Sequence, residues 1–361
     1  MKEGWKKEKF EDVFDLQMGK TPSRDNPSYW EGANTWVSIS DMKDKKYISK
    51  SKEQISDIAV KDSGIKQVKK DTVIMSFKLS IGKTAIAQED LFTNEAIMAF
   101  NVRNGYAITP DYIYYYLRGY KWDGANKAVM GATLNKKTIA SNIFSYPPLP
   151  EQESIVAELD CLSGVIEKQK QQLKELDNLA QAIFYDMFGD PIANEKGWET
   201  CNVIEVVKMQ RGFDLPVQNR NREGNVPIYG SNGIVGYHSE HKVLSGIITG
   251  RSGTLGEVYV SKEPHWPLNT TLFSVDTHGN NVVFLQYLMK NYHLERFKAG
   301  AGVPTLNRND FHNKPIPKIA LQLQEEFASK IEAIEKQKEL IKQSLSETEI
   351  LFNSRMDYYF N

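Results

Sequence analysis

The sequence predicts an α+β protein in which two globular modules of mixed α/β structure alternate with two long helices. Three observations lead to this class. They are a heptad pattern of apolar residues, the recurrence of this pattern near the end of the chain, and short phrases that occur in both halves of the chain. The expected boundaries are 1–150 for the first module, 151–190 for the first helix, 191–319 for the second module and 320–361 for the second helix.

The first long helix is predicted by apolar residues that recur at alternating steps of four and three. The stripe consists of Ile155, Leu159, Leu162, Ile166, Gln169, Leu173, Leu176, Ala180, Ile183 and Met187. Nine of these ten residues are apolar, and Gln169 is the exception. No proline interrupts the stripe, and "GDP" at Gly189–Pro191 supplies a helix end.

The second long helix repeats this stripe at a constant offset, the one that relates Ile155 to Phe327, and seven of its ten positions are apolar. The positions are Phe327, Ile331, Ile334, Lys338, Ile341, Leu345, Thr348, Phe352, Arg355 and Tyr359. The pentapeptide "IEKQK" also occurs twice, at 166–170 and 334–338, but one helical turn out of step with this alignment. The duplication is therefore inferred from the stripes and not from the pentapeptide. We expect a coiled coil whose contacts include Leu159, Leu162, Ile166, Leu173, Leu176, Ile331, Ile334, Ile341 and Leu345.

The two modules share phrases in the same order. "GW" opens both, "YIYYYL" at 112–117 pairs with "VFLQYL" at 283–288, and "MGATLN" at 130–135 pairs with "GVPTLN" at 302–307. Runs such as "DTVIMSF" and "GEVYVS" predict short strands between these anchors. The segments after the first strands, "KTPSRDNPSYWEGANTWVSISDM" and "DLPVQNRNREGNVPIYGSNGIVGYHSE", do not match. We interpret this as a duplicated scaffold with a diverged middle.

Composition is that of an ordinary globular protein, with 40% hydrophobic and 25% charged residues. No apolar run reaches the roughly 18 residues of a membrane-spanning helix, so no membrane partner or membrane span is expected. The start of the chain lacks the apolar core of a signal peptide. Two cysteines, Cys161 and Cys201, cannot build a disulfide framework. We therefore expect a cytoplasmic protein.

Charge alternates along the chain although the total is only −1. The net values are +5 for 1–150, −7 for 151–195, +3 for 196–317 and −2 for 318–361. This alternation of sign bears on the partners of the chain and not on its fold.

Several fragments imitate catalytic motifs without their context. "NPSY" at 26–29 resembles the core of amino-methyltransferases, but no nucleotide-binding sheet precedes it. "SIGKT" at 80–84 lacks the first glycine of a phosphate-binding loop, and "GRSGTLG" at 250–256 has the wrong spacing for a kinase loop. His238 and His241 have no cysteine at metal-ligand spacing. We expect no catalytic site, no metal and no cofactor.

Polar turns on the basic modules are the remaining candidates. "GKTP" at 19–22, "YGSNG" at 229–233 and "TGRSGTLG" at 249–256 combine glycine with side chains that bind phosphates or base edges. Any one of them alone is more often an ordinary hairpin turn. The predicted DNA-binding residues are Lys20, Thr21, Lys78, Ser80, Lys83, Asn135, Lys136, Arg211, Tyr229, Ser231, Asn232, Arg251, Ser252, Thr254 and Asn307.

With these phrases in this order, the whole chain resembles the specificity subunits of Type I restriction–modification enzymes. The resemblance rests on "GWKKEKFEDVFDLQMGKTPSRDNPSYWEG", "VPIYGSNGIVGYH", "GRSGTLGEVYV", "PLNTTLF", "GVPTLN" and "YPPLPEQ". The segment that leads from the second module into its long helix, "PIPKIALQLQEEF", departs from the "PLPEQ" of the first module. This difference leaves the start of the second helix open.

The resemblance implies that each module is a target-recognition domain that reads one half of a split, asymmetric sequence in double-stranded DNA. It also implies that the two helices pair antiparallel as a ruler. Two methyltransferase subunits that methylate adenines would dock on this non-catalytic subunit, and a motor-nuclease subunit would join them for restriction in host defence.

Two other readings remain open from the sequence. A coiled-coil scaffold or adaptor is compatible with the net charge of −1, and salt-dependent DNA binding would argue against it. A stand-alone DNA methyltransferase built on "NPSY" would require adenosylmethionine binding by the isolated chain.

Overall fold

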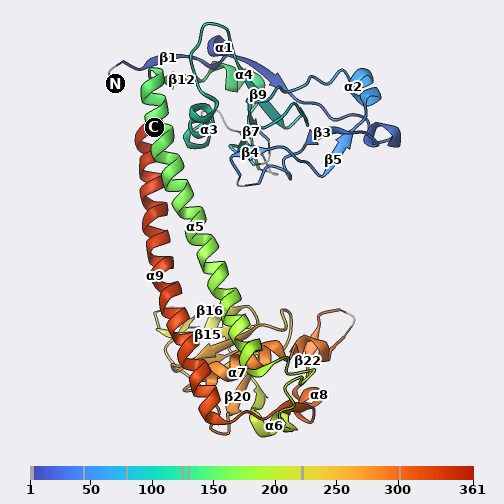
Figure 1. Cartoon of the computed structure of the whole chain (residues 1–361), viewed down its shortest axis with the longest axis vertical. Coiled ribbons are helices and arrows are strands. Elements are labelled where there is room, and N and C mark those ends of the chain that lie inside the picture. Colours follow the sequence, from blue (N-terminus) through green and yellow to red (C-terminus); the bar gives the residue numbers. More distant parts are fainter. Residues whose placement is uncertain are drawn as a thin grey trace. The chain divides into compact units, whose positions relative to one another are not determined.

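The structure is a computed structural model that describes residues 4–43, 45–78, 80–122, 126–128, 131–220, 223–300 and 302–361. The chain forms two compact units. Unit 1 comprises Met1–Lys168 and Leu345–Asn361, and unit 2 comprises Gln169–Ser344. The sequence-based expectation of mixed α/β structure with two long helices that pack together is confirmed (Figure 1).

The two larger sheets of unit 1 consist of short strands. The larger has the order β2-β9-β6-β7-β4, and the smaller has the order β5-β3-β8. The strands are β2 (Phe14–Met18), β3 (Asn34–Val37), β4 (Tyr47–Ile48), β5 (Glu53–Ile55), β6 (Val73–Ser76), β7 (Thr84–Ala87), β8 (Phe92–Thr93) and β9 (Ile97–Val102). Every residue of β6 and β7 is buried, which explains why these runs are continuously apolar or small. Helix α3 (Pro110–Gly119) packs against these two strands.

Unit 2 repeats this arrangement with different residues. Its two larger sheets have the orders β14-β20-β17-β18 and β16-β15-β19. The strands are β14 (Lys208–Arg211), β15 (Val226–Gly230), β16 (Gly233–His238), β17 (Gly246–Gly250), β18 (Val258–Ser261), β19 (Trp266–Pro267) and β20 (Thr271–Asp276). Helix α7 (Val282–Asn291) packs against β17 and β18, as α3 packs against β6 and β7.

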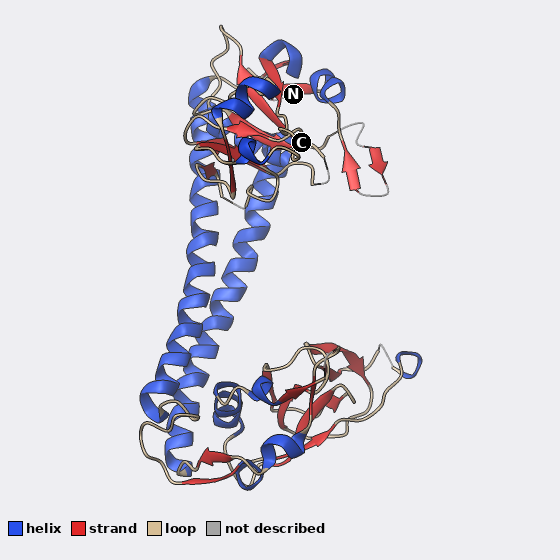
Figure 2. Ribbon diagram, turned by 90° about the vertical axis from the view of Figure 1, so that its right-hand side faces the viewer, coloured by secondary structure: helices blue, strands red, loops and turns tan. Residues whose placement is uncertain are grey.

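Smaller elements complete the two modules (Figure 2). Strand β1 (Lys6–Lys9) pairs antiparallel with β12 (Ile143–Tyr146), and β13 (Thr200–Asn202) pairs in the same way with β23 (Pro315–Pro317). The others are α1 (Phe10–Val13), α2 (Asp57–Ser63), α4 (Lys136–Ser141), α6 (Val203–Val206), α8 (Arg308–His312), η1 (Pro27–Trp30), η2 (Val217–Asn219), η3 (Leu294–Phe297) and the two-stranded pairs β10 (Asn126–Ala128) with β11 (Gly131–Thr133) and β21 (Lys298–Ala299) with β22 (Thr305–Leu306).

The middles of the two modules correspond in backbone although their sequences do not. In unit 1, β3 pairs antiparallel with β5 and parallel with β8. In unit 2, β15 pairs antiparallel with β16 and parallel with β19. The two segments that do not match in sequence therefore share their strand pairing. Non-local strand pairing preserved this sheet while the side chains diverged.

A buried glutamine links each module to its long helix, and the two glutamines are related by the same offset as the helical stripes. Gln152 accepts a hydrogen bond from the Thr109 N–H (3.0 Å) and donates to the carbonyls of Ala107 (3.0 Å) and Pro147 (2.9 Å). Gln324 accepts from the Asn281 N–H (2.9 Å) and donates to the Ile319 carbonyl (2.8 Å). Both side chains thereby hold the first turn of α3 or α7, whose N-caps are Thr109 and Asn281.

The long helices are α5 (Leu149–Phe188) and α9 (Leu321–Phe360), each of 40 residues. Helix α5 begins two residues before the expected start because Pro150 is tolerated in a first helical turn. In unit 2 the helices are antiparallel. Gln169 donates to Ser344 (2.9 Å), and Asp177 pairs with Lys338 (2.7 Å).

In unit 1, Arg355 of α9 forms a bidentate contact with Glu158 of α5, and Tyr359 donates a hydrogen bond to the same carboxylate (2.5 Å). All twenty positions of the two predicted stripes are buried or half-buried, as a paired seam requires. Gln169 and Lys338 are polar members of the stripes, and both therefore lie on the covered face of their helix. Among the described residues, the buried Oε1 atom of Gln169 has no hydrogen-bond partner.

Each unit has its own principal core, and parts of both helices belong to each core. Ile155 and Leu159 of α5, with Met356 and Phe360 of α9, join the core around Phe10 in unit 1. In unit 2, Phe184 and Phe188 of α5 pack with Phe327 and Ile331 of α9 in a second core. Burial of these large apolar side chains ties the helix ends firmly to the modules.

Candidate nucleic-acid interface

The two predicted polar turns of unit 2 come together with the segment that ends at the predicted residue Asn307. A side-chain carbon at Gly253 would lie 3.4 Å from the Ser231 hydroxyl oxygen, so the "YGSNG" and "TGRSGTLG" turns are neighbours. The Leu306 N–H donates to the Arg251 carbonyl (2.8 Å), and Ser252 forms a β-bridge with Thr305. The surface formed by these turns is called the unit 2 polar face below.

Gly250 is required for this convergence. A Cβ atom at Gly250 would lie 1.8 Å from the Thr254 carbonyl oxygen, which is closer than any real contact. The glycine thus lets the loop fold back on itself, and it leaves Thr254 exposed and Arg251 and Ser252 half-buried on the unit 2 polar face. Asn232, at the tip of the neighbouring turn, is also exposed.

Arg251 is oriented by a chain of polar contacts that the sequence did not reveal. Its Nη1 donates to the Asn269 carbonyl (3.3 Å), and the Asn269 side-chain amide donates to the Asp214 carboxylate. The same carboxylate pairs with Arg211 (3.2 Å). Asp214 and Asn269 therefore connect the two predicted arginines, and no sequence signal distinguished them from other loop residues.

The turn at Gly19 in unit 1 and the turn at Gly212 in unit 2 are built from equivalent backbone hydrogen bonds. Gly19 N–H donates to the Ile97 carbonyl (3.1 Å) and Lys20 N–H to the Thr93 carbonyl (2.8 Å). In unit 2, the Gly212 N–H donates to the Thr271 carbonyl (3.0 Å) in the equivalent position. A Cβ at either glycine would lie 2.2 Å from a carbonyl oxygen, so glycine is required at both.

A second pair of positions, Phe77 in unit 1 and Arg251 in unit 2, shares its backbone hydrogen bonds but differs in side chain. Phe77 donates its N–H to the Ala96 carbonyl (3.0 Å), and its carbonyl accepts from Leu134 N–H (2.9 Å). Arg251 occupies this position in unit 2, with its N–H bonded to the Thr270 carbonyl (2.8 Å). The same backbone position thus holds a buried core phenylalanine in unit 1 and a half-buried arginine on the unit 2 polar face.

Thr21 and Lys78 lie near one carboxylate of unit 1, that of Glu95. Thr21 donates its hydroxyl to Glu95, and this hydrogen bond, helped by the charge of Lys78, holds the pKa of Glu95 below its usual range. The Lys20 ammonium group donates to the Ser63 carbonyl. Lys20 is exposed, so a phosphate would have to compete with that single carbonyl for its ammonium group.

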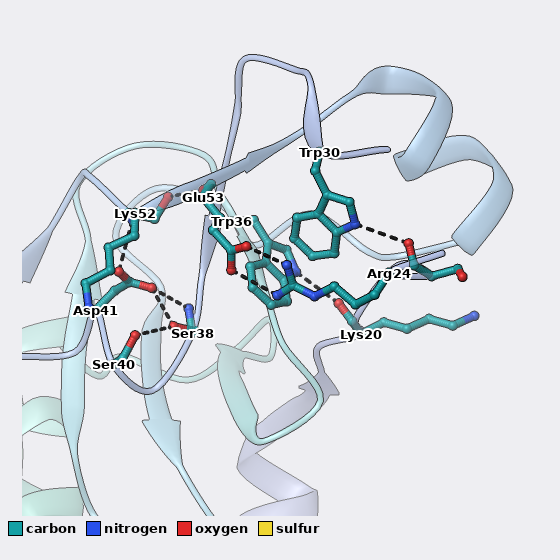
Figure 3. Close-up of polar contacts among 11 residues, drawn as sticks. Lys20, Arg24, Trp30, Trp36, Ser38, Ser40, Asp41, Lys52 and Glu53 are labelled. Carbon is teal, nitrogen blue, oxygen red and sulfur yellow. Dashed lines mark hydrogen bonds and ion pairs between the residues drawn. The ribbon is translucent and has the colours of Figure 1, made fainter. Parts of the chain in front are cut away.

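Arg24 is a candidate that the sequence analysis missed. Figure 3 shows its guanidinium group between the Trp30 ring, 3.6 Å from the ring centroid, and the Glu53 carboxylate, at 2.5 and 2.9 Å. The hydrogen bond from Arg24 lowers the pKa of Glu53. Stacking on an indole pre-orients arginine for planar recognition, and the signal in the sequence was an arginine beside the aromatic run "SYW".

The Lys78–Lys83 hairpin presents Ser80 and Lys83 to solvent. Ser76 closes its base, because its hydroxyl donates to the Ser80 carbonyl and accepts from the Lys83 N–H (3.2 Å). The bond from Leu134 to Phe77 brings the start of α4, and hence exposed Lys136, to this hairpin.

Asn135 and Asn307 serve as helix caps. Their side-chain oxygens accept from Thr138 N–H (2.8 Å) and Asn309 N–H (3.1 Å), respectively. Both residues are exposed, and their amide NH₂ groups remain the donors that could reach DNA.

Tyr229 does not belong to the exposed face. It is 7% exposed and packs in a small core with Ile248 and Phe273, with its ring 5.5 Å from that of His265. The glycine-flanked turn misled the prediction because β15 continues through Tyr229 and turns this side chain inward.

Within the described ranges, no three or more His, Cys, Asp or Glu side chains are grouped so that they could hold a metal ion. No helix among the described residues is long and apolar enough to span a bilayer. Cys161 and Cys201 are free thiols.

Comparison with known proteins identifies the family. The family model for the Type I restriction modification DNA specificity domain matches residues 2–178 and 195–349. A curated relative, the Type I restriction enzyme MjaIX specificity subunit of Methanocaldococcus jannaschii, is 27% identical over 233 residues, which is 59% of this chain and 54% of that protein. The chain thus matches about half the length of this relative.

Two solved structures share the fold. The Type I restriction–modification S subunit from M. genitalium has a TM-score of 0.60 at 16% identity, covering 98% of this chain and 95% of that chain. A chain of a type I R-M system, solved to explain complex assembly and conformational transition, has a TM-score of 0.64 at 16% identity and covers 99% and 98% of the two chains. The family match spans both duplicated modules and most of both long helices. The chain therefore belongs to the Type I restriction modification DNA specificity domain family.

Proposed function

We propose that this chain directs adenine methylation and restriction by partner subunits to a bipartite, asymmetric sequence in double-stranded DNA. Specificity subunits of this family are the non-catalytic DNA-recognition components of Type I restriction–modification systems. The proposed partners are two methyltransferase subunits and one motor-nuclease subunit. The proposed modules are residues 1–150 and 191–319, with spacer helices at 151–190 and 320–361.

The observation that carries this proposal is a shared backbone frame with unlike side chains. Phe77 and Arg251 occupy equivalent positions with equivalent hydrogen bonds, as do Gly19 and Gly212. The residues that follow these glycines, Lys20 and Phe213, differ in charge and shape. Two modules built alike but displaying different donors and acceptors would read different half-sites, which makes the combined site asymmetric.

The test is an exchange of one module's variable segment. Residues 20–110 are replaced by the corresponding segment of another specificity subunit, and the chain is co-expressed with its methyltransferase partners. Methylome sequencing should show one changed half-site and one unchanged half-site. Methylation that changes in both half-sites would contradict modular reading, and sequence-independent methylation would favour a scaffold role.

A further inference from the structure

Two hollows occupy equivalent places in the two units. In unit 1, a hollow of about 920 Å³ lies between the loop 41–52, helix α3 and helix α5. In unit 2, a hollow of about 620 Å³ is lined by α7, α5, α9 and Lys262. In each hollow, one lysine of the module forms an ion pair with a carboxylate of a long helix. Lys46 binds Asp160 (2.6 Å), and Lys262 binds Glu332 (2.5 Å), where the two carboxylates are related by the offset of the helical stripes.

The unit 2 hollow is internally neutral. Its three lysines are all paired with carboxylates, since Lys290 binds Glu257 (3.1 Å) and Lys338 binds both Asp177 and Glu335 (2.7 Å each). Three lysines and three carboxylates line it, so it offers no surplus charge to a ligand.

The unit 1 hollow carries a surplus of positive charge. Five lysines line it against the carboxylates of Asp41, Asp160 and Glu167. Lys46 is only 17% exposed and is occupied by Asp111 (2.7 Å) as well as Asp160. The other carboxyl group of the loop, that of Asp44, lies outside the described residues.

The four other lysines of this hollow are exposed. They are Lys43, Lys45, Lys50 and Lys52. Across the described part of unit 1, none of the four forms an ion pair within 4 Å. Asp41 does not neutralise them directly, because its two oxygens accept hydrogen bonds from Ser38 (2.9 and 2.6 Å) and from the Lys52 backbone N–H (3.0 Å). The Asp41 contacts and the Lys46 ion pairs thus hold the loop to the body of unit 1 and leave four ammonium groups available.

We propose that the unit 1 hollow binds phosphate groups of the DNA backbone beside the half-site read by the first module, without regard to sequence. This inference rests on the proposed function. Four cations spread along the loop from Lys43 to Lys52 suit a linear polyanion better than a single compact anion, and lysine contacts phosphate as a point charge. Because the unit 2 hollow offers no equivalent surplus, this contact with the DNA backbone is expected in the first module only.

The test compares two double variants that remove the same charge. Lys50→Gln/Lys52→Gln removes two positive charges from the unit 1 hollow. Lys262→Gln/Lys290→Gln removes two from the neutral unit 2 hollow and is the matched control. Fluorescence anisotropy measures affinity for the cognate duplex and for a scrambled duplex between about 50 and 200 mM salt, with the full chain and its methyltransferase partners. Lys43→Gln/Lys45→Gln serves as an independent second pair.

For each phosphate that a lysine no longer neutralises, the slope of log K against log salt should flatten by about 0.9, hence by about 1.8 for two lysines. The affinity ratio of wild type to Lys50→Gln/Lys52→Gln should then shrink about 12-fold from the lowest to the highest salt, equally for both duplexes. The control double variant should keep the wild-type slope.

If Lys50→Gln/Lys52→Gln and the control double variant changed the slope equally, the effect would come from the net charge of the chain and the inference would be overturned. Unchanged slopes in both Lys50→Gln/Lys52→Gln and Lys43→Gln/Lys45→Gln would also overturn it. Binding of ATP that the Lys50→Gln/Lys52→Gln change abolishes, with the DNA slope intact, would overturn it in favour of a free nucleotide. Equal wild-type affinity for cognate and scrambled duplexes would instead refute the proposed function.

Discussion

Replacing the buried Gln152 by methionine should loosen unit 1 and leave unit 2 intact. Gln152 has no exposed surface, and its amide makes three hydrogen bonds that join the start of α5 to the start of α3. Methionine has a similar length and is apolar, so Gln152→Met removes these bonds without leaving a large cavity. The mirror change, Gln324→Met, should loosen unit 2 instead.

The expected loss follows from the surroundings of each bond. The Pro147 carbonyl is buried, so leaving it unpaired costs about 1–3 kcal/mol. The Thr109 N–H and the Ala107 carbonyl are only partly buried and can bind water, so removing each bond costs roughly 0.5–1.5 kcal/mol. The free energy of unfolding of unit 1 should therefore fall by about 2–6 kcal/mol.

Hydrogen–deuterium exchange with mass spectrometry on the full chain can locate this loss. In Gln152→Met, exchange should rise in peptides that cover α3 and the start of α5, and in Gln324→Met it should rise in peptides that cover α7. Gln171→Met is the control, since Gln171 lies on the exposed face of α5 and, among the described residues, its side chain bonds to Glu175 (3.0 Å) alone. Urea denaturation gives the magnitude.

A loss below about 0.5 kcal/mol in Gln152→Met would refute the reasoning, because it would place the amide in water or leave its partners otherwise satisfied. Increased exchange in α7 instead of α3 would show that the two glutamines do not act within separate units.

Three further outcomes are expected. Arg251→Ala should weaken binding of cognate DNA by about 1–3 kcal/mol in anisotropy titrations and relax one half-site, whereas an unchanged affinity would remove Arg251 from the interface. Gly212→Ala should lower the unfolding free energy in urea by about 1–3 kcal/mol, because its Cβ would lie 2.2 Å from the Leu268 carbonyl oxygen. Burial lowers the pKa of His312, whose neutral ring accepts from Met209 N–H (3.1 Å). Its contribution to stability is therefore complete above the ordinary pKa of about 6.5 and is lost as pH falls through the lowered pKa, and His312→Gln should reduce this part of the acid sensitivity in urea midpoints.

The long helices and the duplication were predictable from the sequence because both rest on local, repeated patterns. A stripe with alternating steps of four and three defines one helical face wherever the helix lies, and its recurrence from Phe327 onward revealed the second helix. The same offset relates Gln152 to Gln324 and Asn135 to Asn307 in the structure. Gly19 was visible as part of the "GKTP" turn, although the sequence did not say which carbonyl oxygen it approaches.

Tertiary structure decided which polar residues share a surface. Arg251, Asn269 and Asp214 are neighbours only because strand pairing brings three loops together. Tertiary structure also decided the roles of Tyr229 and Arg24. Tyr229 was predicted to bind DNA but is buried in a core, whereas Arg24 was overlooked and is stacked on Trp30. Helical stripes follow from the periodicity of one segment, whereas a binding face arises from backbone hydrogen bonds between segments distant in the chain. No local pattern encodes the partners of those bonds.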